Sequence, residues 1–269
     1  VAKLFACVSI DGLSFMHPEP PLIASSPAVL VTGAGKNIGR AIALRLAADG
    51  AAIVVNGRSD EAAIKAVAEE ITAAGGRAMA YRADITKPEE VAAMAAAVAA
   101  QFGGVDILVT NAGLRRQTSF LDMSFAEWRE ILSVALDGAF IITQAFAQQM
   151  IARGGGSIIG LSGISTHVGT PNRAHVSASK SGLEGLMRAL AVELAPKGIR
   201  ANCVAPGAVD TVRGASAGSM PSTLADGGIP MRRRASVAEI ADVVRMLAGP
   251  EGGYITGQTI HVNGGAFLT

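Results

Sequence analysis

Short apolar runs of strand length alternate along the chain with longer alanine-rich runs that carry charged residues. Short apolar runs bounded by turn residues are typical of buried strands, and the longer alanine-rich runs are typical of helices. Strands are expected over residues 29–32, 51–56, 78–83, 105–110, 157–161, 200–205 and 259–262. Helices are expected after the turn at 33–39 and over 60–73, 86–101, 124–151 and 172–195, with capping boxes at Thr86 and Ser236.

This alternation predicts the fold class. Near-continuous apolar strands joined by helical crossovers form a parallel sheet that helices cover on both faces. We therefore expect an α/β fold of one domain, a doubly wound parallel sheet of the Rossmann type, which binds ligands beyond the carboxyl ends of its strands. The loops that leave this edge start at Gly33, Gly57, Asp84, Asn111, Leu161 and Pro206.

The length and composition fit one domain with an unusual beginning. A chain of 269 residues that is 50% hydrophobic can bury a full core. Residues 1–27 end in a proline-rich stretch and are expected to form an irregular extension. Residues 28–269 are expected to form the domain, including a substrate loop at about 206–235.

Charge and cysteine content exclude several classes of function. A net charge of +1 offers no field to attract nucleic acid or an anionic membrane, and no apolar run reaches membrane-spanning length. Cys7 and Cys203 make neither a disulfide framework nor a metal motif, and the four histidines are scattered, so no metal site is expected. These features favour a reducing compartment, and we expect a cytoplasmic protein.

The glycine-rich turn at residues 33–39 is the first candidate binding site. It lies between an apolar strand and a helix, where bare peptide N–H groups and the positive end of the helix dipole favour a phosphate. The general dinucleotide spacing GxGxxG does not fit, because Ile38 stands at its last glycine. Glycines at such a turn also serve close packing alone, so other motifs must decide the function.

Four motifs in order give the chain a family resemblance. Residues 32–39 (TGAGKNIG) match a TGxxxGxG turn with Asn37 in place of the middle glycine, a mild change because asparagine tolerates left-handed backbone angles. The other motifs are Asp84-Ile85, Asn111-Ala112-Gly113, and Pro206-Gly207 followed by Thr211. Over residues 28–265 the chain resembles the short-chain dehydrogenase/reductase family, close to its ketoacyl-reductase-like members.

The resemblance implies a set of cofactor-binding residues. In the family these positions hold a nicotinamide dinucleotide, from the adenine at residues 84–85 to the nicotinamide amide at Thr211. They are Gly33, Gly35, Lys36, Asn37, Ile38, Gly39, Arg58, Asp84, Ile85, Asn111, Ala112, Gly113, Lys180, Pro206, Gly207, Val209 and Thr211.

The choice between cofactors has its own argument. NAD-preferring relatives place an acidic residue at the end of the second strand, where it binds the ribose hydroxyls. This chain has Gly57 there, followed by Arg58, and Lys36 in the glycine turn is a second cation. Two cations without a carboxylate suit a 2′-phosphate, so the sequence favours NADP(H) over NAD(H), although both cations can also be plain surface charges.

The residues that move the proton in the family are replaced here. The resemblance places Val176 at the catalytic tyrosine, Gly163 at the serine and Ala135 at the asparagine, and it keeps only Lys180, which holds the nicotinamide ribose. The usual proton relay is therefore not expected to operate. Positioning of donor and acceptor can still supply roughly 7–11 kcal/mol, so catalysis is not excluded.

Two histidines are candidate replacements for the proton donor, because histidine suits proton transfer near neutral pH. His167 is expected in a loop at the carboxyl edge of the fifth strand, and His175 precedes Val176 but lies about 100° around the helix from it. Lys180, His167 and His175 are thus the candidate catalytic residues. Ser162 and Ser165 are weaker candidates, read as packing or turn residues.

Three function hypotheses follow. The first is an NADP(H)-dependent oxidoreductase with a non-standard proton donor that acts on a carbonyl or imine of a small molecule, where Arg115, Arg116 or Arg173 could hold an anionic group. The second is non-redox chemistry as a lyase, isomerase or cyclase with bound NADP, and the third is an inactive dinucleotide-binding module. The family resemblance further implies a homotetramer, or next a homodimer, with residues 253–257 at an interface.

Overall fold

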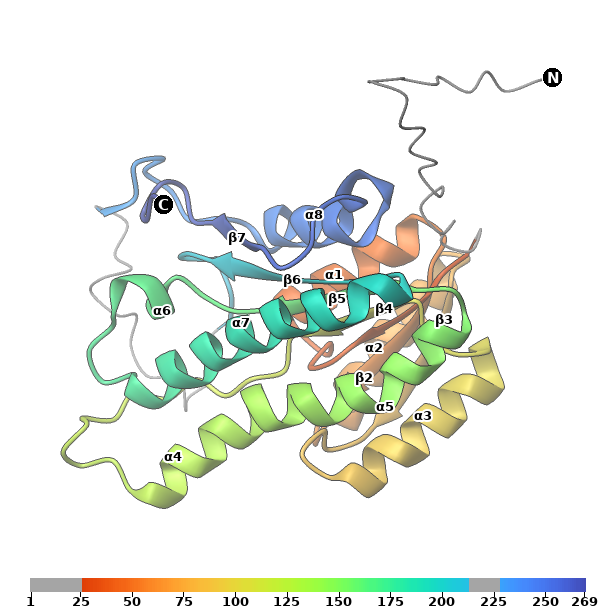
Figure 1. The fold of residues 1–269 in the computed structure, drawn as a ribbon, viewed down its shortest axis with the longest axis horizontal. Helices are drawn as coiled ribbons and strands as arrows, with labels where there is room; N and C mark the ends of the chain where they lie inside the picture. The colour runs from red at the N-terminus through yellow and green to blue at the C-terminus, as the bar shows by residue number, and fades with distance from the viewer. Residues whose placement is uncertain (1–25, 213–227) are drawn as a thin grey trace, which may run out of the picture.

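The computed structural model describes residues 26–212 and 228–269, whose centre is a seven-stranded, wholly parallel sheet (Figure 1). The strand order is β3-β2-β1-β4-β5-β6-β7. The strands are β1 (Ala28–Val31), β2 (Ala52–Gly57), β3 (Arg77–Arg82), β4 (Ile107–Thr110), β5 (Gly156–Leu161), β6 (Ile199–Pro206) and β7 (Thr259–Val262). The expected α/β fold with a doubly wound parallel sheet is confirmed.

Helices cover the sheet on both faces, as Figure 1 shows. They are α1 (Asn37–Ala48), α2 (Glu61–Ala73), α3 (Pro88–Phe102), α4 (Phe125–Leu132), α5 (Gly138–Ala152), α6 (Ser165–Val168), α7 (Ala174–Leu194) and α8 (Val237–Ala248). Three shorter turns are the π-helical η1 (Ser133–Asp137) and the 3₁₀ turns η2 (Ala195–Lys197) and η6 (Pro250–Gly252).

Each face of the sheet has its own hydrophobic core. On one face α1, α2 and α8 bury side chains such as Ile42, Ile64 and Val244. On the other face α3, α5 and α7 bury side chains such as Phe146 and Leu183. The strands are apolar in both directions because side chains alternate between these two cores, which explains their near-continuous apolar runs.

The strand order positions the binding site. Val29 of β1 pairs with Ile53 of β2 on one side and with Ile107 of β4 on the other. The chain therefore winds outward in opposite directions from β1, and the loops after β1 and β4 separate. In doubly wound sheets the crevice at this switch point, beyond the carboxyl ends of the strands, is where ligands bind.

The predicted helix over 124–151 is interrupted, so that expectation was wrong in detail. Five residues of π-helix, η1, separate α4 from α5. Gly138, which starts α5, packs so closely on the loop before α3 that a Cβ there would lie 2.7 Å from Ile85 Cγ1. A π-helical turn of this kind is common at functional sites. The sequence did not predict it, because the pattern of apolar residues was read with the single period of an α-helix.

The N-terminal caps of α4 and α8 form as predicted, and that of α3 does not. Ser236 and Glu239 form the expected reciprocal capping box of α8, and Ser124 caps α4 by accepting a hydrogen bond from the Glu127 amide. The capping box expected at Thr86 does not form. The Thr86 hydroxyl donates to Asp84 Oδ1 at 2.8 Å, and α3 begins at Pro88 without a side-chain cap.

Among the described residues, Phe125–Ala152 is the stretch that is long and apolar enough to cross a membrane by length and composition, with 39% of its apolar window buried. The expectation that no apolar run reaches membrane-spanning length was therefore wrong for this stretch. Ile131, Ile142 and Phe146 of this stretch are fully buried against the rest of the fold, which is the pattern of a core helix.

Two sequence expectations fall outside the described residues. Residues 1–25 of the irregular extension expected at 1–27 lie outside the described part of the chain. So does half of the substrate loop expected at about 206–235, namely residues 213–227.

Candidate functional site

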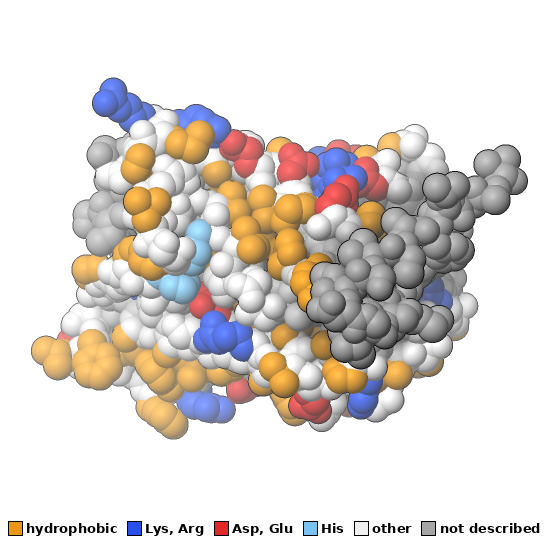
Figure 2. All heavy atoms as spheres, turned by 45° about the horizontal axis from the view of Figure 1, so that its top comes forward, with side chains coloured by type: hydrophobic (Ala, Val, Ile, Leu, Met, Phe, Trp, Pro, Cys, Tyr) orange, Lys and Arg blue, Asp and Glu red, His pale blue; other side chains and the backbone are white. Residues whose placement is uncertain are grey.

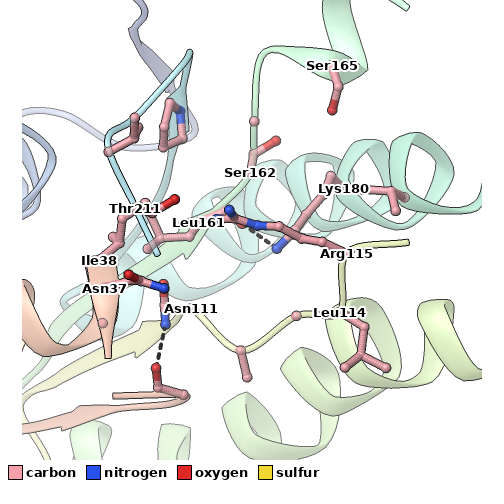
Figure 3. Close-up of a pocket in the computed structure, with 18 of the residues that line it drawn as sticks. Asn37, Ile38, Asn111, Leu114, Arg115, Leu161, Ser162, Ser165, Lys180 and Thr211 are labelled. Carbon is pink, nitrogen blue, oxygen red and sulfur yellow. Dashed lines mark hydrogen bonds between the residues drawn. The ribbon is translucent and has the colours of Figure 1, made fainter. Parts of the chain in front are cut away.

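A groove of about 410 Å³ opens at the carboxyl edge of the sheet, beyond the switch point (Figure 3). The loops that follow β1, β4, β5 and β6 and the first turns of α7 line it. We call it the carboxyl-edge groove. Thirteen of the predicted cofactor-binding residues line it, namely Gly33, Lys36, Asn37, Ile38, Gly39, Asn111, Ala112, Gly113, Lys180, Pro206, Gly207, Val209 and Thr211.

The glycine turn and the loop after β4 are locked together at the floor of this groove. Asn111 Nδ2 donates to the carbonyl oxygens of Thr32 and Gly33 at 2.9 and 3.0 Å. The Thr32 hydroxyl accepts in return from the amides of Asn111 and Ala112, each at 3.0 Å. Thr32 thus positions both loops, a role that the sequence reading did not assign to it.

Gly39 shows why this turn needs glycine. A Cβ at Gly39 would lie 2.4 Å from the Gly33 carbonyl oxygen and 2.6 Å from Asn111 Nδ2, distances that no side chain tolerates. The first turn of α1 therefore packs directly on the glycine turn. Residues 37–39 at this turn line the groove, and the N-terminus of a helix is a favourable place for a bound phosphate.

Asn37 adopts the left-handed backbone conformation that its place in the motif predicts, with φ of +51°. Its side chain also makes two hydrogen bonds to the backbone of Val212, on the loop after β6. Asn37 Nδ2 donates to the Val212 carbonyl oxygen at 2.9 Å, and Asn37 Oδ1 accepts from the Val212 amide at 3.0 Å. A glycine here could not make these bonds, so the substitution joins the glycine turn to the loop after β6.

Four predicted cofactor residues do not line the groove. Gly35 packs against α2, where its Cβ would lie 3.1 Å from Ala63 Cβ. Asp84 accepts two hydrogen bonds from Thr86, and Ile85 is 5% exposed in the core. Arg58 is an exposed side chain after β2.

Gly57 packs closely on α2 at the end of β2. A Cβ there would lie 2.7 Å from Ile64 Cγ2, so a larger residue would require the Ile64 side chain to shift. Lys36, which lines the groove, is exposed.

Lys180 and Val176 stand one helical turn apart in the groove wall formed by α7. The Lys180 ammonium donates to the Leu161 carbonyl oxygen at 2.6 Å (Figure 3). Removal from water, and secondly repulsion from the Arg115 guanidinium, lower the pKa of Lys180 to about 8. Val176 is 6% exposed and presents only methyl groups to the groove.

His167 is not in a loop, because residues 165–168 form the short helix α6. Four residues are too few to give a helical period in the sequence. His167 Nε2 lies 3.0 Å from Glu184 Oε1, and the imidazole does not belong to the groove lining. Hydrogen bonds connect His167 to the groove indirectly, because Glu184 also accepts a hydrogen bond from Ser162, which lines the groove.

His175 points away from the groove. The side chain is fully buried, and its Nε2 lies 3.2 Å from Glu127 Oε1 on α4. Hydrogen bonds from Thr118 and then from His175 lower the pKa of Glu127. His175 therefore joins α7 to α4, as the offset of about 100° from Val176 allows.

Glu184 is a buried carboxylate that the sequence reading missed. It is 4% exposed and accepts from Ser162, from Thr166 at 3.3 Å and from His167. The available signal was its position four residues after Lys180, which puts both side chains on the same face of α7.

His167 and His261 are both partly exposed, and Figure 2 shows histidine side chains at the surface of the face that it draws. The rings of His167 and His261 meet edge to face with centroids 4.5 Å apart. Burial, and secondly His167, lower the pKa of His261. Among the described residues, no three His, Cys, Asp or Glu side chains gather where they could hold a metal ion.

The groove lining contains cations but no Asp or Glu among the described residues. Arg115 and Arg173 line it together with Lys36 and Lys180, whereas Arg116 is paired with Glu130 outside it. Ser162 and Ser165 also line it. The groove thus offers positive charge and hydroxyl groups to a ligand.

Comparison with known proteins agrees with this geometry. A family model described as enoyl-(acyl carrier protein) reductase matches residues 33–266. The chain is 40% identical over 240 residues to a 3-oxoacyl-[acyl-carrier-protein] reductase FabG of Staphylococcus epidermidis, covering 89% of this chain and 98% of that protein. It is 37% identical over 240 residues to a 3-oxoacyl-[acyl-carrier-protein] reductase of Synechocystis, covering 89% of this chain and 96% of that protein.

A reductase of the same name from Aquifex aeolicus is 39% identical over 239 residues, covering 88% of this chain and 96% of that protein. The matches span both the glycine turn and the last strand of the sheet. The chain therefore belongs to the short-chain dehydrogenase/reductase family of oxidoreductases and is related to its 3-oxoacyl-[acyl-carrier-protein] reductases.

Proposed function

We propose that this protein is an NADP(H)-dependent oxidoreductase that reduces a carbonyl or imine group of a small molecule and uses Lys180 as its proton donor. The observation that carries the proposal is that one groove holds the glycine turn, the loop at Asn111, Lys180 and Thr211 together. Glycine-lined N–H groups suit the phosphates at one end, and an ammonium stands at the other end, where the reacting group would lie.

The groove fits a nicotinamide dinucleotide. A Cβ at Gly113 would lie 3.3 Å from Lys180 Nζ, so glycine at this position keeps the path from the glycine turn to the ammonium open. Lys180 keeps further N–H donors beyond the one bound to Leu161, and these can hold ribose hydroxyls. A bound nicotinamide dinucleotide would supply the hydride.

The phosphorylated cofactor is favoured by charge. Lys36 lines the groove near the glycine turn, and Gly57 presents no carboxylate that could bind the ribose hydroxyls. A 2′-phosphate accepts strong, charge-assisted hydrogen bonds from a lysine. Arg58 follows Gly57 and adds positive charge outside the groove.

Proton transfer needs a group inside the groove, because Val176, Gly163 and Ala135 stand at the positions of the family's tyrosine, serine and asparagine. Of the three catalytic candidates, Lys180 lines the groove and the two histidines do not. A lysine with a pKa of about 8 is an effective general acid near neutral pH. Lys180 would release its proton to the carbonyl oxygen or imine nitrogen as the hydride reaches the adjacent carbon.

The first experiment separates the hypotheses by titration of the purified chain with NADPH, followed by a screen for NADPH oxidation. The probes are an acetoacetyl thioester, simple ketones and a cyclic imine. NADPH oxidation with any of them supports the proposal. Turnover that requires NADP⁺ but leaves it unchanged selects non-redox chemistry. Saturable binding without turnover selects an inactive module, and no binding rejects all three.

Lys36→Ala tests the cofactor preference. Loss of a charge-assisted bond to the 2′-phosphate is expected to weaken NADPH binding by about tenfold, since such a bond contributes about 1.5–3 kcal/mol before solvent exposure reduces it. NADH binding is expected not to change. Arg40→Ala is the matched control, because Arg40 is a cation of α1 that pairs with Glu70 outside the groove. Equal weakening of NADPH and NADH by Lys36→Ala would contradict the assignment.

A further inference from the structure

The hydroxyl groups of the carboxyl-edge groove differ in how they are bonded. Ser162 Oγ donates its one proton to Glu184, so it has no further hydrogen bond to donate to a ligand. Among the described residues, Ser165 Oγ has no hydrogen-bond partner, although Ser165 is 7% exposed and lines the groove. Thr211 also lacks a side-chain partner there, but it lies beside Asn37 and Ile38, away from α6 (Figure 3).

The Ser165 hydroxyl lies beside an empty side-chain position. Gly163 has no side chain, and a Cβ built on it would lie 3.9 Å from Ser165 Oγ. The next atom that such a Cβ would meet is the Pro206 carbonyl oxygen at 4.0 Å, so the space is open. The Ser165 hydroxyl therefore lies close to the space that a side chain at position 163 would enter.

The short helix α6 directs this hydroxyl. Ser165 is the first residue of α6, and the Ser177 hydroxyl of α7 donates to the Ser165 carbonyl oxygen at 3.2 Å. Thr166 Oγ1 donates to the Gly163 carbonyl oxygen at 3.0 Å and closes the turn between β5 and α6. Figure 3 shows the Ser165 hydroxyl pointing from α6 toward the groove.

We propose that Ser165 donates a hydrogen bond to the carbonyl oxygen of the substrate and so takes the place of the side chain that residue 163 lacks. This proposal rests on the proposed reductase function, and it assigns the substrate as a carbonyl compound rather than an imine. A protonated imine carries a positive charge, which the Lys180 and Arg115 cations of the lining would repel, and the described lining has no Asp or Glu to offset that repulsion.

The step balances without a change in Ser165. Bound NADPH would supply the hydride and become NADP⁺. The hydride adds to the carbonyl carbon, the π-electron pair of the carbonyl moves to its oxygen, and that oxygen takes the proton released by Lys180, which becomes a neutral amine. Ser165 keeps its own proton throughout. Its hydrogen bond strengthens as negative charge grows on the oxygen, so it lowers the barrier rather than only tightening binding.

The test removes the hydroxyl and then returns it from residue 163. Ser165→Ala is expected to lower kcat for an acetoacetyl thioester by about 100-fold with little change in KM, the size seen when one oxyanion donor is removed. The double variant Gly163→Ser with Ser165→Ala is expected to regain most of the lost activity. NADPH binding, followed by fluorescence, is expected to stay the same in all variants.

Thr166→Ala is the matched control. It also removes a hydroxyl from α6, but Thr166 does not line the groove. A loss of kcat in Thr166→Ala equal to that in Ser165→Ala would assign the effect to disturbance of α6 and overturn the proposal. An unchanged kcat in Ser165→Ala would overturn it as well.

A second readout does not require turnover. The infrared C=O stretch of the acetoacetyl thioester, labelled with ¹³C at the 3-oxo carbon and bound beside NADP⁺, is expected at a lower frequency in the wild type than in Ser165→Ala. An equal frequency in both proteins, or no bound carbonyl signal in the wild type, overturns the proposal. If NADPH oxidation is absent but the frequency difference is present, the reductase function fails and the assignment of Ser165 stands.

Discussion

Lys180 combines three properties that together determine its chemistry. It is held by the Leu161 carbonyl at 2.6 Å, faces the groove, and lies close enough to Arg115 for the repulsion to act on its titration. Burial disfavours the charged form of an amine, and a neighbouring cation does so further. Both effects lower the pKa of Lys180, to about 8, and make its ammonium a better proton donor than a lysine in water.

The pH dependence of the rate tests this role. The ammonium form exists below the pKa, so reduction is expected to be independent of pH below neutrality and to fall above about pH 8. Oxidation of the alcohol needs the neutral amine and is expected to rise over the same range. The measurement is kcat for both directions from pH 6 to about 10.

Two variants assign the titration. Lys180→Met is expected to lower kcat by about 10²–10⁴-fold, the usual contribution of a general acid. Lys180→Arg retains a cation that stays protonated, so the fall above pH 8 is expected to vanish from its profile. A fall that persists near pH 8 in Lys180→Arg would show that another group donates the proton.

At the scale of elements, a buried ion pair ties three of them together at the edge of the sheet opposite the groove. Asp106, just before β4, accepts from Arg153 Nε at 2.7 Å and from Arg153 Nη2 at 2.8 Å at the end of α5. Asp106 Oδ2 also accepts from the Ala28 amide at 2.7 Å, at the start of β1. The side chain of Asp106 is 8% exposed and that of Arg153 is 25% exposed.

Asp106→Ala is expected to lower the free energy of unfolding by about 3 kcal/mol, because it leaves a largely buried guanidinium and a strand amide without their acceptor. Urea unfolding, followed by the fluorescence of Trp128 at fixed protein concentration, measures the change. Activity per folded molecule is expected to stay the same, since the groove is at the other edge.

The control is a pair of similar geometry at the surface. Arg40 and Glu70 lie 2.6 Å apart with side chains 43% and 45% exposed. Glu70→Ala is expected to cost less than about 1 kcal/mol, because water already solvates both charges. A cost for Asp106→Ala no larger than for Glu70→Ala would refute the structural role of the buried pair.

Across the whole molecule, two of the places where large apolar side chains are exposed among the described residues are suited to contacts between subunits. Phe125 and Phe140 of the α4–α5 stretch are 77% and 50% exposed. Tyr254, which follows η6, has 104% relative exposure and lies in the segment expected at an interface. One self-complementary surface makes a dimer, and a second one allows two dimers to pair.

We therefore expect a tetramer, with a mass by light scattering of four times the 27.3 kDa chain. Phe140→Glu or Tyr254→Glu alone is expected to leave dimers, and the two together monomers, because each charge blocks one apolar contact. Lys65→Glu on α2, a charge reversal outside both places, is the control and is expected to leave the tetramer intact. A monomeric wild type would reject both surfaces as interfaces.

The fold class and most of the residues that line the carboxyl-edge groove were predictable from the sequence alone. Strands buried on both faces read as apolar runs, and crossover helices must fill the spaces between them, so a parallel sheet followed from local patterns. The glycine turn and Asn111 were recognisable because close backbone approach leaves few residue choices at a given position. Asn37 even retained the positive φ that its motif implies.

What the side chains around Gly163 and Val176 can do depends instead on how the helices and strands pack together. His167 and His175 have suitable chemistry and neighbouring positions, but Glu184 and Glu127 hold their imidazoles outside the groove lining. Glu184 and α6 were not predicted from the sequence, because a single buried carboxylate and a four-residue helix produce no periodic pattern of apolar residues. Groups such as the Ser165 hydroxyl are brought beside Gly163 by how α6 packs, and packing depends on contacts between elements that no local pattern encodes.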